Sequence, residues 1–308
     1  MSAVLVVRGA ADSGAIRRAL PGVLVHDLLD LNSPLPADTA VIVLRSGVRL
    51  GERELDALPR LRHVVRTGSG IDHIDVSALR KRDITLHRNA EAGAGAVGEW
   101  VLAAALALAR RIPLGQHALL LGQHEKQACM GASLGTLATG IWGAGPVGLA
   151  ADWALAPYVG RTAFAAWPSN PPGLRELSQT ALMEQSQVHV IALPLRPTTE
   201  NLFGEDFLER VAPQRPLLIC AGRLETLDLT ACLRALADGR LSGLALDPVE
   251  REHLPLLTGS TTPPLNLLAS PHIGAQRSDV RGALDRWAVD LLREITADDK
   301  ILIEEGHR

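Results

Sequence analysis

Short apolar runs alternate with amphipathic segments along the first hundred residues of the chain. The apolar runs are predicted to be strands: Val4–Val7, Val23–Val25, Val41–Leu44, Leu61–Arg66 and Ile84–His87. The segments between them with helical spacing are predicted to be helices: Ser13–Leu20, Glu52–Leu58 and Asp75–Lys81. Strands that alternate with helices form a parallel sheet with helices on its faces, so this region is predicted to be one α/β unit.

The same alternation returns after a long helix and a stretch of little periodicity. An Ala- and Leu-rich helix is predicted over Val97–Ile112, ended by Pro113, and residues 115–136 show no clear pattern. Six further strands are predicted: Leu137–Trp142, Thr162–Ala166, Val188–Leu193, Leu217–Cys220, Leu241–Leu246 and Leu267–Ala269. Five further helices are predicted: Pro146–Ala156, Leu174–Glu184, Glu205–Val211, Leu229–Asp238 and Ser278–Ile295. The predicted fold class is therefore α/β, with two Rossmann-like or flavodoxin-like parallel-sheet domains and a cleft between them.

Size and charge narrow the class of protein. The chain has 308 residues, which fits two domains of about 100–200 residues each. Hydrophobic residues make up 47% and charged residues 21% of the chain, as in an ordinary globular protein, and the net charge is −3. A nucleic-acid partner would require a basic patch or stripe, whereas the arginines are spread along the whole sequence. We therefore expect no nucleic-acid partner.

Neither the cysteines nor the apolar runs indicate a secreted or membrane protein. The three cysteines, Cys129, Cys220 and Cys232, form neither a disulfide framework nor a metal-ligand spacing. The longest apolar run, Trp100–Ala109, is too short to span a membrane, and the N-terminal sequence lacks the pattern of a signal peptide. We expect a cytoplasmic protein with reduced thiols, no bound metal and no membrane partner.

A glycine-rich turn opens the second α/β run. The sequence Gly143-Ala144-Gly145-Pro146-Val147-Gly148 matches G-x-G-x-x-G, and it follows a predicted strand and precedes a predicted helix. In that context the first glycine makes the tight turn, the second admits a pyrophosphate, and the third allows close packing of helix and strand. The helix N-terminus presents unpaired N–H groups to the phosphates. The pattern predicts a dinucleotide site, and a packing turn without a ligand is the alternative.

The residue that usually holds the adenosine ribose is missing. Such turns are followed about 20 positions later by an acidic residue, but Trp167 stands at that place and no Asp or Glu lies near it. Loss of the acid removes a repulsion against a 2′-phosphate, and Arg175 lies eight residues further on. The choice between NAD and NADP is therefore left open, with NAD preferred.

Three residues late in the chain have the side chains that reduction of a keto acid requires. Arg223 and Glu252 follow predicted strands, and His272 follows Pro271. Ligands of open parallel sheets bind at the carboxyl ends of strands, so the three are expected to face one cleft. His can donate a proton near neutral pH, a carboxylate stabilises its imidazolium form, and Arg offers a fork of donors for a substrate carboxylate.

Seven segments in chain order carry a family resemblance. They are Arg66-Thr67-Gly68-Ser69-Gly70-Ile71-Asp72-His73-Ile74-Asp75, Ala96-Val97-Gly98-Glu99, Gly143–Gly148, Pro194-Leu195-Arg196-Pro197-Thr198-Thr199, Ala221-Gly222-Arg223, Ala245-Leu246-Asp247 with Glu252, and Ser270-Pro271-His272-Ile273-Gly274-Ala275. Together they resemble the D-isomer-specific 2-hydroxyacid dehydrogenases over nearly the whole chain. The Asp72–Asp75 segment also resembles the phosphoglycerate and erythronate-4-phosphate dehydrogenase branch of that family.

The resemblance implies roles for individual residues. Arg223 would bind the substrate carboxylate and carbonyl, His272 would be the acid/base, and Glu252 would orient His272 and stabilise its protonated form. Asp247 would contact the nicotinamide amide, and the backbone N–H groups of Ser69 and Gly70 would hold the substrate carboxylate. The remaining cofactor contacts would come from the glycine turn and from Trp167, Pro194, Thr199 and Ala221. Gly68 would complete this substrate loop, and Arg45, from its place after a predicted strand, is a further candidate substrate residue.

The resemblance also implies a domain plan and a homodimer. Residues 1–97 with 276–308 would form the substrate domain and residues 98–275 the NAD(P)-binding domain. The long helix would cross between them and help to form the dimer. Arg8 and Arg45 follow predicted strands, and with Arg66 and Arg223 they would suit a substrate with a phosphate, a phosphonate or a second carboxylate. The alternative is that two of these arginines are solvated or paired with carboxylates.

Departures from the family pattern keep other functions open. Cys220 replaces the usual Asn, Leu224 the usual Gly after the Arg, and His253 the usual Pro after the Glu. The leading hypothesis is an enzyme that transfers a hydride between NAD(P)(H) and C2 of a small 2-hydroxy or 2-keto acid. One alternative is a non-catalytic NAD(H)-sensing protein of the same fold. Another is an oxidoreductase of that fold acting on a donor such as formate or phosphite.

Overall fold

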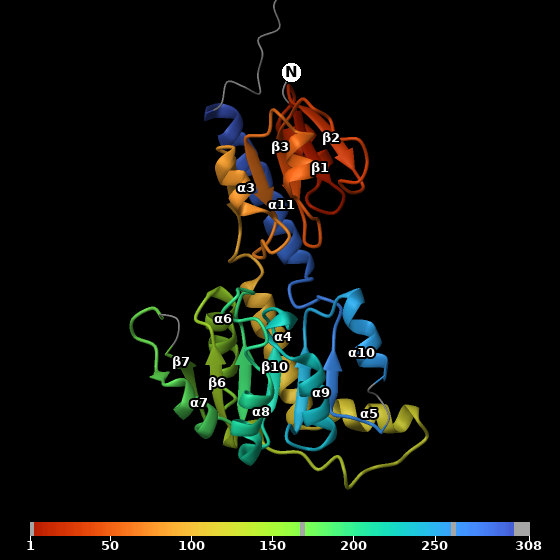
Figure 1. The fold of residues 1–308 in the computed structure, drawn as a ribbon, viewed down its shortest axis with the longest axis vertical. Coiled ribbons are helices and arrows are strands. Elements are labelled where there is room, and N and C mark those ends of the chain that lie inside the picture. The colour runs from red at the N-terminus through yellow and green to blue at the C-terminus, as the bar shows by residue number, and fades with distance from the viewer. Residues whose placement is uncertain (1–2, 167–169, 260–262, 299–308) are drawn as a thin grey trace, which may run out of the picture. The chain divides into compact units, whose positions relative to one another are not determined.

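The chain folds into two compact units. The structure is a computed structural model and describes residues 3–166, 170–259 and 263–298. Unit 1 comprises residues 1–93 and 277–308, and unit 2 comprises residues 94–276 (Figure 1). Among the described residues, no helix combines the length and the apolar character that crossing a membrane requires.

Unit 1 is built on a parallel sheet of five strands in the order β2-β1-β3-β4-β5. Its strands are β1 (Ala3–Val7), β2 (Leu24–Leu28), β3 (Thr39–Leu44), β4 (His63–Arg66) and β5 (Thr85–Arg88). Every residue of β1 and β3 is buried, as expected for central strands that are covered on both faces. The predicted strands are confirmed, although β2 begins and ends later than the run Val23–Val25 suggested.

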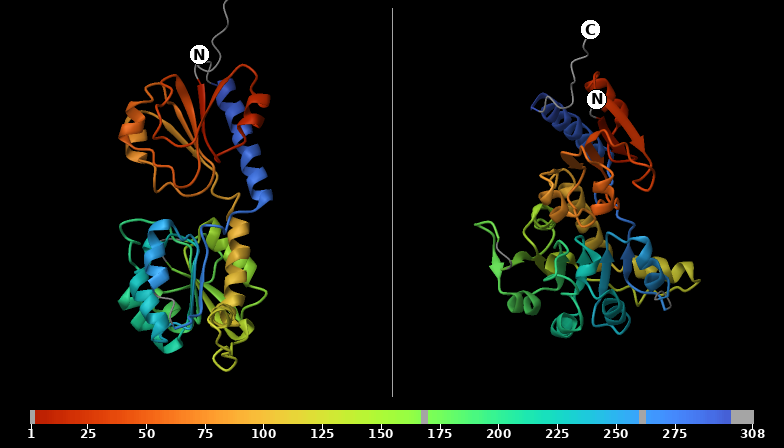
Figure 2. Two further views of the ribbon diagram at one scale, coloured as in Figure 1. Left: turned by 90° about the vertical axis from the view of Figure 1, so that its right-hand side faces the viewer. Right: turned by 45° about the horizontal axis from the view of Figure 1, so that its top comes forward.

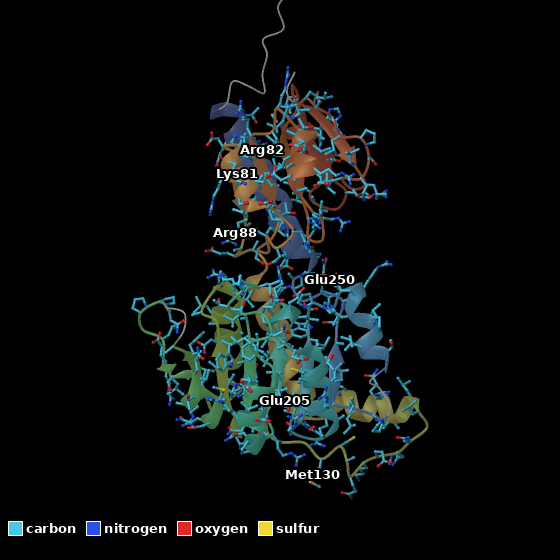
Figure 3. The ribbon with its side chains drawn as sticks, viewed as in Figure 1. Lys81, Arg82, Arg88, Met130, Glu205 and Glu250 are labelled. Atoms are coloured by element: carbon cyan, nitrogen blue, oxygen red, sulfur yellow. The ribbon has the colours of Figure 1, made fainter. Side chains whose placement is uncertain are left out.

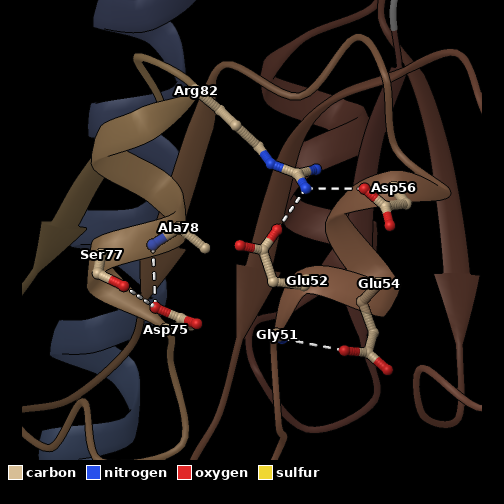
Figure 4. A network of polar contacts seen from close by, with 8 residues as sticks. All are labelled: Gly51, Glu52, Glu54, Asp56, Asp75, Ser77, Ala78 and Arg82. Carbon is tan, nitrogen blue, oxygen red and sulfur yellow. Dashed lines mark hydrogen bonds and ion pairs between the residues drawn. The ribbon is translucent and has the colours of Figure 1, made fainter.

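Helices cover both faces of this sheet (Figure 2). One face packs against α2 (Glu52–Asp56) and α3 (Val76–Lys81), and the other against α1 (Ser13–Ala19) and α11 (Ser278–Asp298). Asp75 caps α3 by accepting from Ala78 N, and Arg82 Nη2 donates to Glu52 and Asp56 at 2.5 and 2.7 Å (Figure 4). These contacts join α2 to the end of α3 on one side of the sheet.

Unit 2 is built on a parallel sheet of seven strands in the order β12-β11-β10-β9-β6-β7-β8. Its strands are β6 (Ala138–Trp142), β7 (Arg161–Ala165), β8 (Glu176–Leu177), β9 (Val188–Ile191), β10 (Leu217–Cys220), β11 (Gly243–Leu246) and β12 (Leu267–Ala269). The order reverses between β6 and β9, which is the switch point where open α/β sheets bind ligands. The predicted α/β class is therefore confirmed in both units.

Helices also cover both faces of the second sheet. One face packs against α4 (Ala94–Ala109) and α6 (Pro146–Leu155). The other packs against α7 (Gln179–Gln185), α8 (Glu205–Val211), α9 (Leu229–Ala237) and α10 (Leu254–Gly259). Short 3-10 turns complete the unit: η1 (Leu134–Thr136), η2 (Ala212–Gln214), η3 (Leu224–Thr226) and η4 (Arg251–His253).

The structure corrects two of the predicted helices. The helix expected over Val97–Ile112 ends at Ala109, and α5 (Ile112–Leu120) begins in the region expected to lack structure. Arg111 adopts φ 52 between them, and Pro113 starts α5 instead of only ending the previous helix. The helix expected over Leu174–Glu184 begins at Gln179, because Ser178 caps it and Glu176–Leu177 pairs with β7.

Candidate active site

The glycine-rich turn joins β6 to α6 at the carboxyl edge of the second sheet. A Cβ on Gly143 (φ +105) would lie 2.9 Å from the carbonyl oxygen of Ala192, and one on Gly148 only 1.8 Å from that of Gly143. These two glycines are therefore required by the protein itself. A Cβ on Gly145 would meet nothing within 4 Å, although this residue caps α6. Its missing side chain leaves space beside the helix N-terminus, where a pyrophosphate would bind.

A neutral side chain, that of Asn170, contacts the end of β7, the strand next to the glycine turn. Asn170 donates from Nδ2 to Ala165 O at 2.8 Å, at the end of β7. Its Oδ1 is buried, and none of the described residues donates a hydrogen bond to it. Trp167, predicted to contact the cofactor, lies outside the described residues. These features fit a dinucleotide, with the turn and the N-terminus of α6 holding its phosphates.

His272 lies in the loop after β12 and contacts a carboxylate. Its Nδ1 lies 2.9 Å from Oε1 of Glu250, and the two side chains are 36% and 51% exposed. Glu250 follows β11 and is labelled in Figure 3. The expected partner, Glu252, is corrected by this contact: the side chain that reaches His272 lies two residues earlier. His272 adopts φ +58, which turns the chain sharply at this residue.

A buried carboxylate holds the loop that carries His272. Asp247, only 4% exposed, lies directly after β11. It accepts from Ser270 Oγ at 2.6 Å and Ile273 N at 2.8 Å through Oδ1, and from Gly274 N at 3.0 Å through Oδ2. A Cβ on Gly274 would lie 2.9 Å from Oδ2, so a side chain there would displace the carboxylate. Asp247 therefore positions the segment on either side of His272.

Arg223 follows β10 in the same sheet. It is partly buried, and its backbone carbonyl accepts from Thr226 Oγ1 at 2.6 Å and from Cys220 Sγ at 3.5 Å. Burial raises the pKa of the Cys220 thiol to about 12, so the thiol stays protonated and can donate. Gly222 packs against the segment just after β9, since a Cβ there would lie 2.5 Å from Leu193 O. Cys220, where the family has Asn, thus supports the arginine loop.

Glu252 belongs to a second group of side chains. With Glu225 and His253 it offers ligand-type atoms that lie within 4.8 Å of one another. His253 Nδ1 accepts from the backbone N–H of Glu250 at 3.0 Å. A neutral His253 therefore carries its proton on Nε2, a form in which Nε2 donates a hydrogen bond and has no lone pair for a metal. The group spans two loops: Glu225 lies in η3 after β10, and Glu252 and His253 lie in η4 after β11.

The other predicted cofactor residues follow strands of the same edge. Pro194 is exposed after β9, and Ala221 N donates to Ile191 O at 2.9 Å. Thr199 is buried, and its Oγ1 donates to Pro194 O at 2.7 Å and accepts from Arg196 N at 2.8 Å. Thr199 therefore folds its own loop, and its hydroxyl is already engaged by that loop.

The predicted substrate residues of unit 1 follow β3 and β4. Arg45 donates from Nε to Arg8 O at 2.7 Å, which holds its guanidinium over the turn after β1. Arg66 is only 7% exposed and donates to Thr67 O at 2.5 Å and Gly70 O at 2.9 Å. Its guanidinium surrounds Gly68 (φ +138), where a Cβ would lie 2.7 Å from Nη1. Arg66 therefore shapes the loop of Gly68, Ser69 and Gly70.

The fold and this edge define a class, a two-unit α/β protein with a dinucleotide-type turn and a histidine–carboxylate pair. The comparison with known families is more specific. The family model described as "D-isomer specific 2-hydroxyacid dehydrogenase, NAD binding domain" matches residues 102–274, more than half of the chain. The chain belongs to the D-isomer-specific 2-hydroxyacid dehydrogenase family.

Relatives agree with this assignment. A D-3-phosphoglycerate dehydrogenase from Synechocystis is 26% identical over 82% of this chain and 46% of its own length. A glyoxylate/hydroxypyruvate reductase B from Yersinia pseudotuberculosis is 28% identical over 81% of this chain and 79% of its own. The chain spans about half the length of the phosphoglycerate dehydrogenases that it matches. A crystal structure of D-lactate dehydrogenase from Aquifex aeolicus with NAD and lactic acid has the same fold, with TM-score 0.82, 21% identity and 97% coverage of both chains.

Proposed function

We propose that the protein is an NAD(P)-dependent oxidoreductase that transfers a hydride between the nicotinamide and C2 of a small 2-hydroxy or 2-keto acid. The observation that carries this proposal is the 2.9 Å contact of His272 with Glu250. It lies at the sheet edge that also holds the glycine turn and Arg223. A binding protein that only senses the cofactor has no need of an oriented acid/base.

The residues divide the work of the reaction. The bound nicotinamide cofactor would accept or supply the hydride at C2. Arg223 would bind the substrate carboxylate and polarise the carbonyl, because its planar donors match both groups. With Nδ1 of His272 turned to Glu250, Nε2 is the nitrogen that would give a proton to the carbonyl oxygen or take it from the hydroxyl. Glu250 would keep the proton of a neutral His272 on Nδ1 and stabilise the imidazolium.

The two units would have different roles. We infer that residues 1–97 with 276–308 bind the substrate and residues 98–275 bind the cofactor, as the family resemblance implies. The N–H groups of Ser69 and Gly70 would hold the substrate carboxylate. Arg45 would favour a substrate with a second negative group, since Arg66 is already engaged by its own loop.

The cofactor phosphate and the assembly also belong to this proposal. A neutral Asn170 at the end of β7 neither repels nor specifically binds a 2′-phosphate, so both NAD and NADP are compatible with it. A homodimer is supported by apolar side chains exposed on α4, α5 and α6. They are Leu106 (40%), Leu120 (78%) and Trp153 (81%), and such exposure marks interaction surfaces when the residues are contiguous. The reduced, buried Cys220 and Cys232 suit a cytoplasmic protein.

The test combines cofactor titration with three matched variants. Purified protein is titrated with NADH and NADPH by fluorescence, and kcat/KM is then measured with 2-keto acids that include phosphorylated and phosphonylated members. His272→Asn tolerates the left-handed backbone and should lower kcat/KM by about 10²–10⁴-fold while the cofactor still binds. Glu250→Gln should lower it by about 10²-fold, and Glu252→Gln should leave it within about twofold.

Each outcome decides between the candidate functions. Cofactor binding without turnover of any keto acid, formate or phosphite would favour the NAD(H)-sensing protein. Turnover of formate or phosphite alone would show that the protein is an oxidoreductase of this fold that acts on such a donor and not on a 2-hydroxy acid. If Glu252→Gln is impaired and Glu250→Gln is not, the pairing of His272 with Glu250 is wrong while the reaction itself stands.

A further inference from the structure

A cavity of about 280 Å³ opens at the amino edge of the second sheet, away from the glycine turn. Its wall includes Leu137, Gln187 and Ser242, each of which immediately precedes a strand. The glycine turn follows the opposite end of β6, and a strand of five residues places about 16 Å between the two ends. Met130, labelled in Figure 3, lies in the loop that borders the cavity. The cavity is therefore separate from the candidate active site.

The charged side chains described in the cavity wall are positive. Among the described residues that line it, Arg111 and Arg215 are the ionisable ones and none is a carboxylate. Arg111 donates from Nη1 to Ala128 O at 2.9 Å, and Arg215 from Nε to Gly239 O at 3.0 Å. Neither forms an ion pair with a carboxylate of residues 3–166, 170–259 or 263–298. Since a guanidinium has five N–H donors, most donors of both side chains are available to a ligand.

Both arginines also adopt an unfavourable backbone conformation. Arg111 has φ 52 and Arg215 has φ 46, so two of the five described non-glycine residues with positive φ line this one cavity. Glycine or asparagine would adopt this conformation at lower cost. Residues held in strained conformations cluster at ligand sites and clamps. The presence of arginine in place of glycine at these two turns therefore indicates that the guanidinium groups themselves have a function, such as binding a ligand.

Amide and apolar groups complete the wall. Gln187 accepts from Ala138 N through Oε1 at 2.9 Å, which leaves its Nε2 as a donor. Leu108, Leu137 and Leu217 supply apolar surface. The chemistry suits a small oxyanion head that is bound by guanidinium groups and carries a short aliphatic stem.

We propose that this cavity binds a small organic anion, an alkyl phosphate or aliphatic carboxylate, between Arg111 and Arg215. The site lies beside Leu108 and Ala109 at the end of α4, the helix that begins unit 2. An anion there would neutralise two like charges and join the end of α4 to the start of β10. This proposal does not depend on the reaction proposed for the carboxyl edge.

The test is isothermal titration calorimetry of the full chain with n-butyl phosphate, pentanoate and inorganic phosphate at constant ionic strength. Wild type should bind both alkyl anions, and n-butyl phosphate about tenfold more tightly than inorganic phosphate because its stem is buried. The double variant R111Q/R215Q should lose at least tenfold in affinity. Arg110→Gln, an exposed neighbour outside the cavity, is the matched control and should bind as wild type does.

Two further variants separate the site from a folding defect and from the active site. Gln187→Glu keeps an oxygen that accepts from Ala138 N but adds a negative charge, so it should weaken anion binding without unfolding the strand edge. Arg223→Gln should retain binding, since it alters only the carboxyl edge. The proposal fails if wild type shows no saturable binding at millimolar concentrations. It also fails if Q187E and R111Q/R215Q keep the wild-type affinity, or if R223Q abolishes binding.

Discussion

Asp247 of unit 2 and Arg66 of unit 1 perform the same task with opposite charges. Each is nearly buried at the carboxyl end of a strand and binds the backbone of a loop that carries candidate site residues. Asp247 binds a loop 23 to 27 residues away that follows another strand. Arg66 binds its own loop, one and four residues away. A buried charge that connects two strands is therefore expected to matter more than one that shapes a single turn.

The largest effect on stability is expected when the buried carboxylate of Asp247 is removed. Asp247→Ala would leave Ser270 Oγ and the N–H groups of Ile273 and Gly274 without their acceptor. We expect a loss of about 3 kcal/mol in the free energy of unfolding, because buried donors that lose their partner cost about 1–3 kcal/mol each and the buried charge is removed at the same time. Urea denaturation measures the loss, and hydrogen–deuterium exchange should show faster exchange in residues 270–274.

The control for this change is an exposed acid of the same unit. Asp206 lies in the first turn of α8. The variant Asp206→Asn should change the free energy of unfolding by less than about 1 kcal/mol. If Asp247→Ala unfolds no more easily than this control, Asp247 does not hold the His272 loop.

The same contrast predicts a smaller and local effect at Arg66. Arg66→Met keeps much of the apolar volume but removes the donors to Thr67 O and Gly70 O. We expect a loss of about 2 kcal/mol, since hydrogen bonds from a charged group contribute about 1.5–3 kcal/mol and the cost of burying the charge is relieved. Hydrogen exchange should rise in residues 67–70 and remain unchanged in unit 2. The exposed neighbour variant Arg62→Met should stay within about 0.5 kcal/mol of wild type, and an equal loss in both would refute the assignment.

These two loops also show where prediction from the sequence succeeds and where it stops. Buried strands such as Leu217–Cys220 were predictable because uninterrupted apolar runs between turn residues have few other interpretations. The glycine turn was predictable because strand, turn and helix all occur in the required order. Both signals are local, since each is contained in a few consecutive residues.

The carboxylate partner of His272 could not be predicted from the spacing of residues along the sequence. Glu252 was expected from its distance along the chain from Asp247, but η4 turns the backbone between Glu250 and His253 and directs the side chains of this segment differently. The backbone pairing of Val249 N with Ser270 O, at 3.0 Å, brings Glu250 close to the His272 loop. Likewise, Pro113 was interpreted as the end of a helix although proline is equally suited to begin one.

His189 is a third buried ionisable group, and it differs from Asp247 and Arg66 because it stays neutral. His189 in β9 is fully buried and accepts from Trp142 Nε1 through Nδ1 at 3.2 Å. Burial lowers the pKa of His189 from 6.5 to about 3. Below pH 6.5 the unfolded chain binds a proton that the folded chain does not, so this group makes folding less favourable as the pH falls toward 3. The expected loss is about 1.4 kcal/mol for each pH unit inside that window.

Urea denaturation between pH 7 and pH 5 tests this effect. His189→Gln keeps an acceptor for Trp142 Nε1 and cannot titrate, so its free energy of unfolding should fall less steeply with decreasing pH than that of wild type. His124→Gln removes an exposed histidine and should leave the slope unchanged. Equal slopes for wild type and His189→Gln would mean that His189 takes up its proton without unfolding. A buried group would then tolerate charge in this core, and the difference between Asp247 and Arg66 would have to come from connectivity alone.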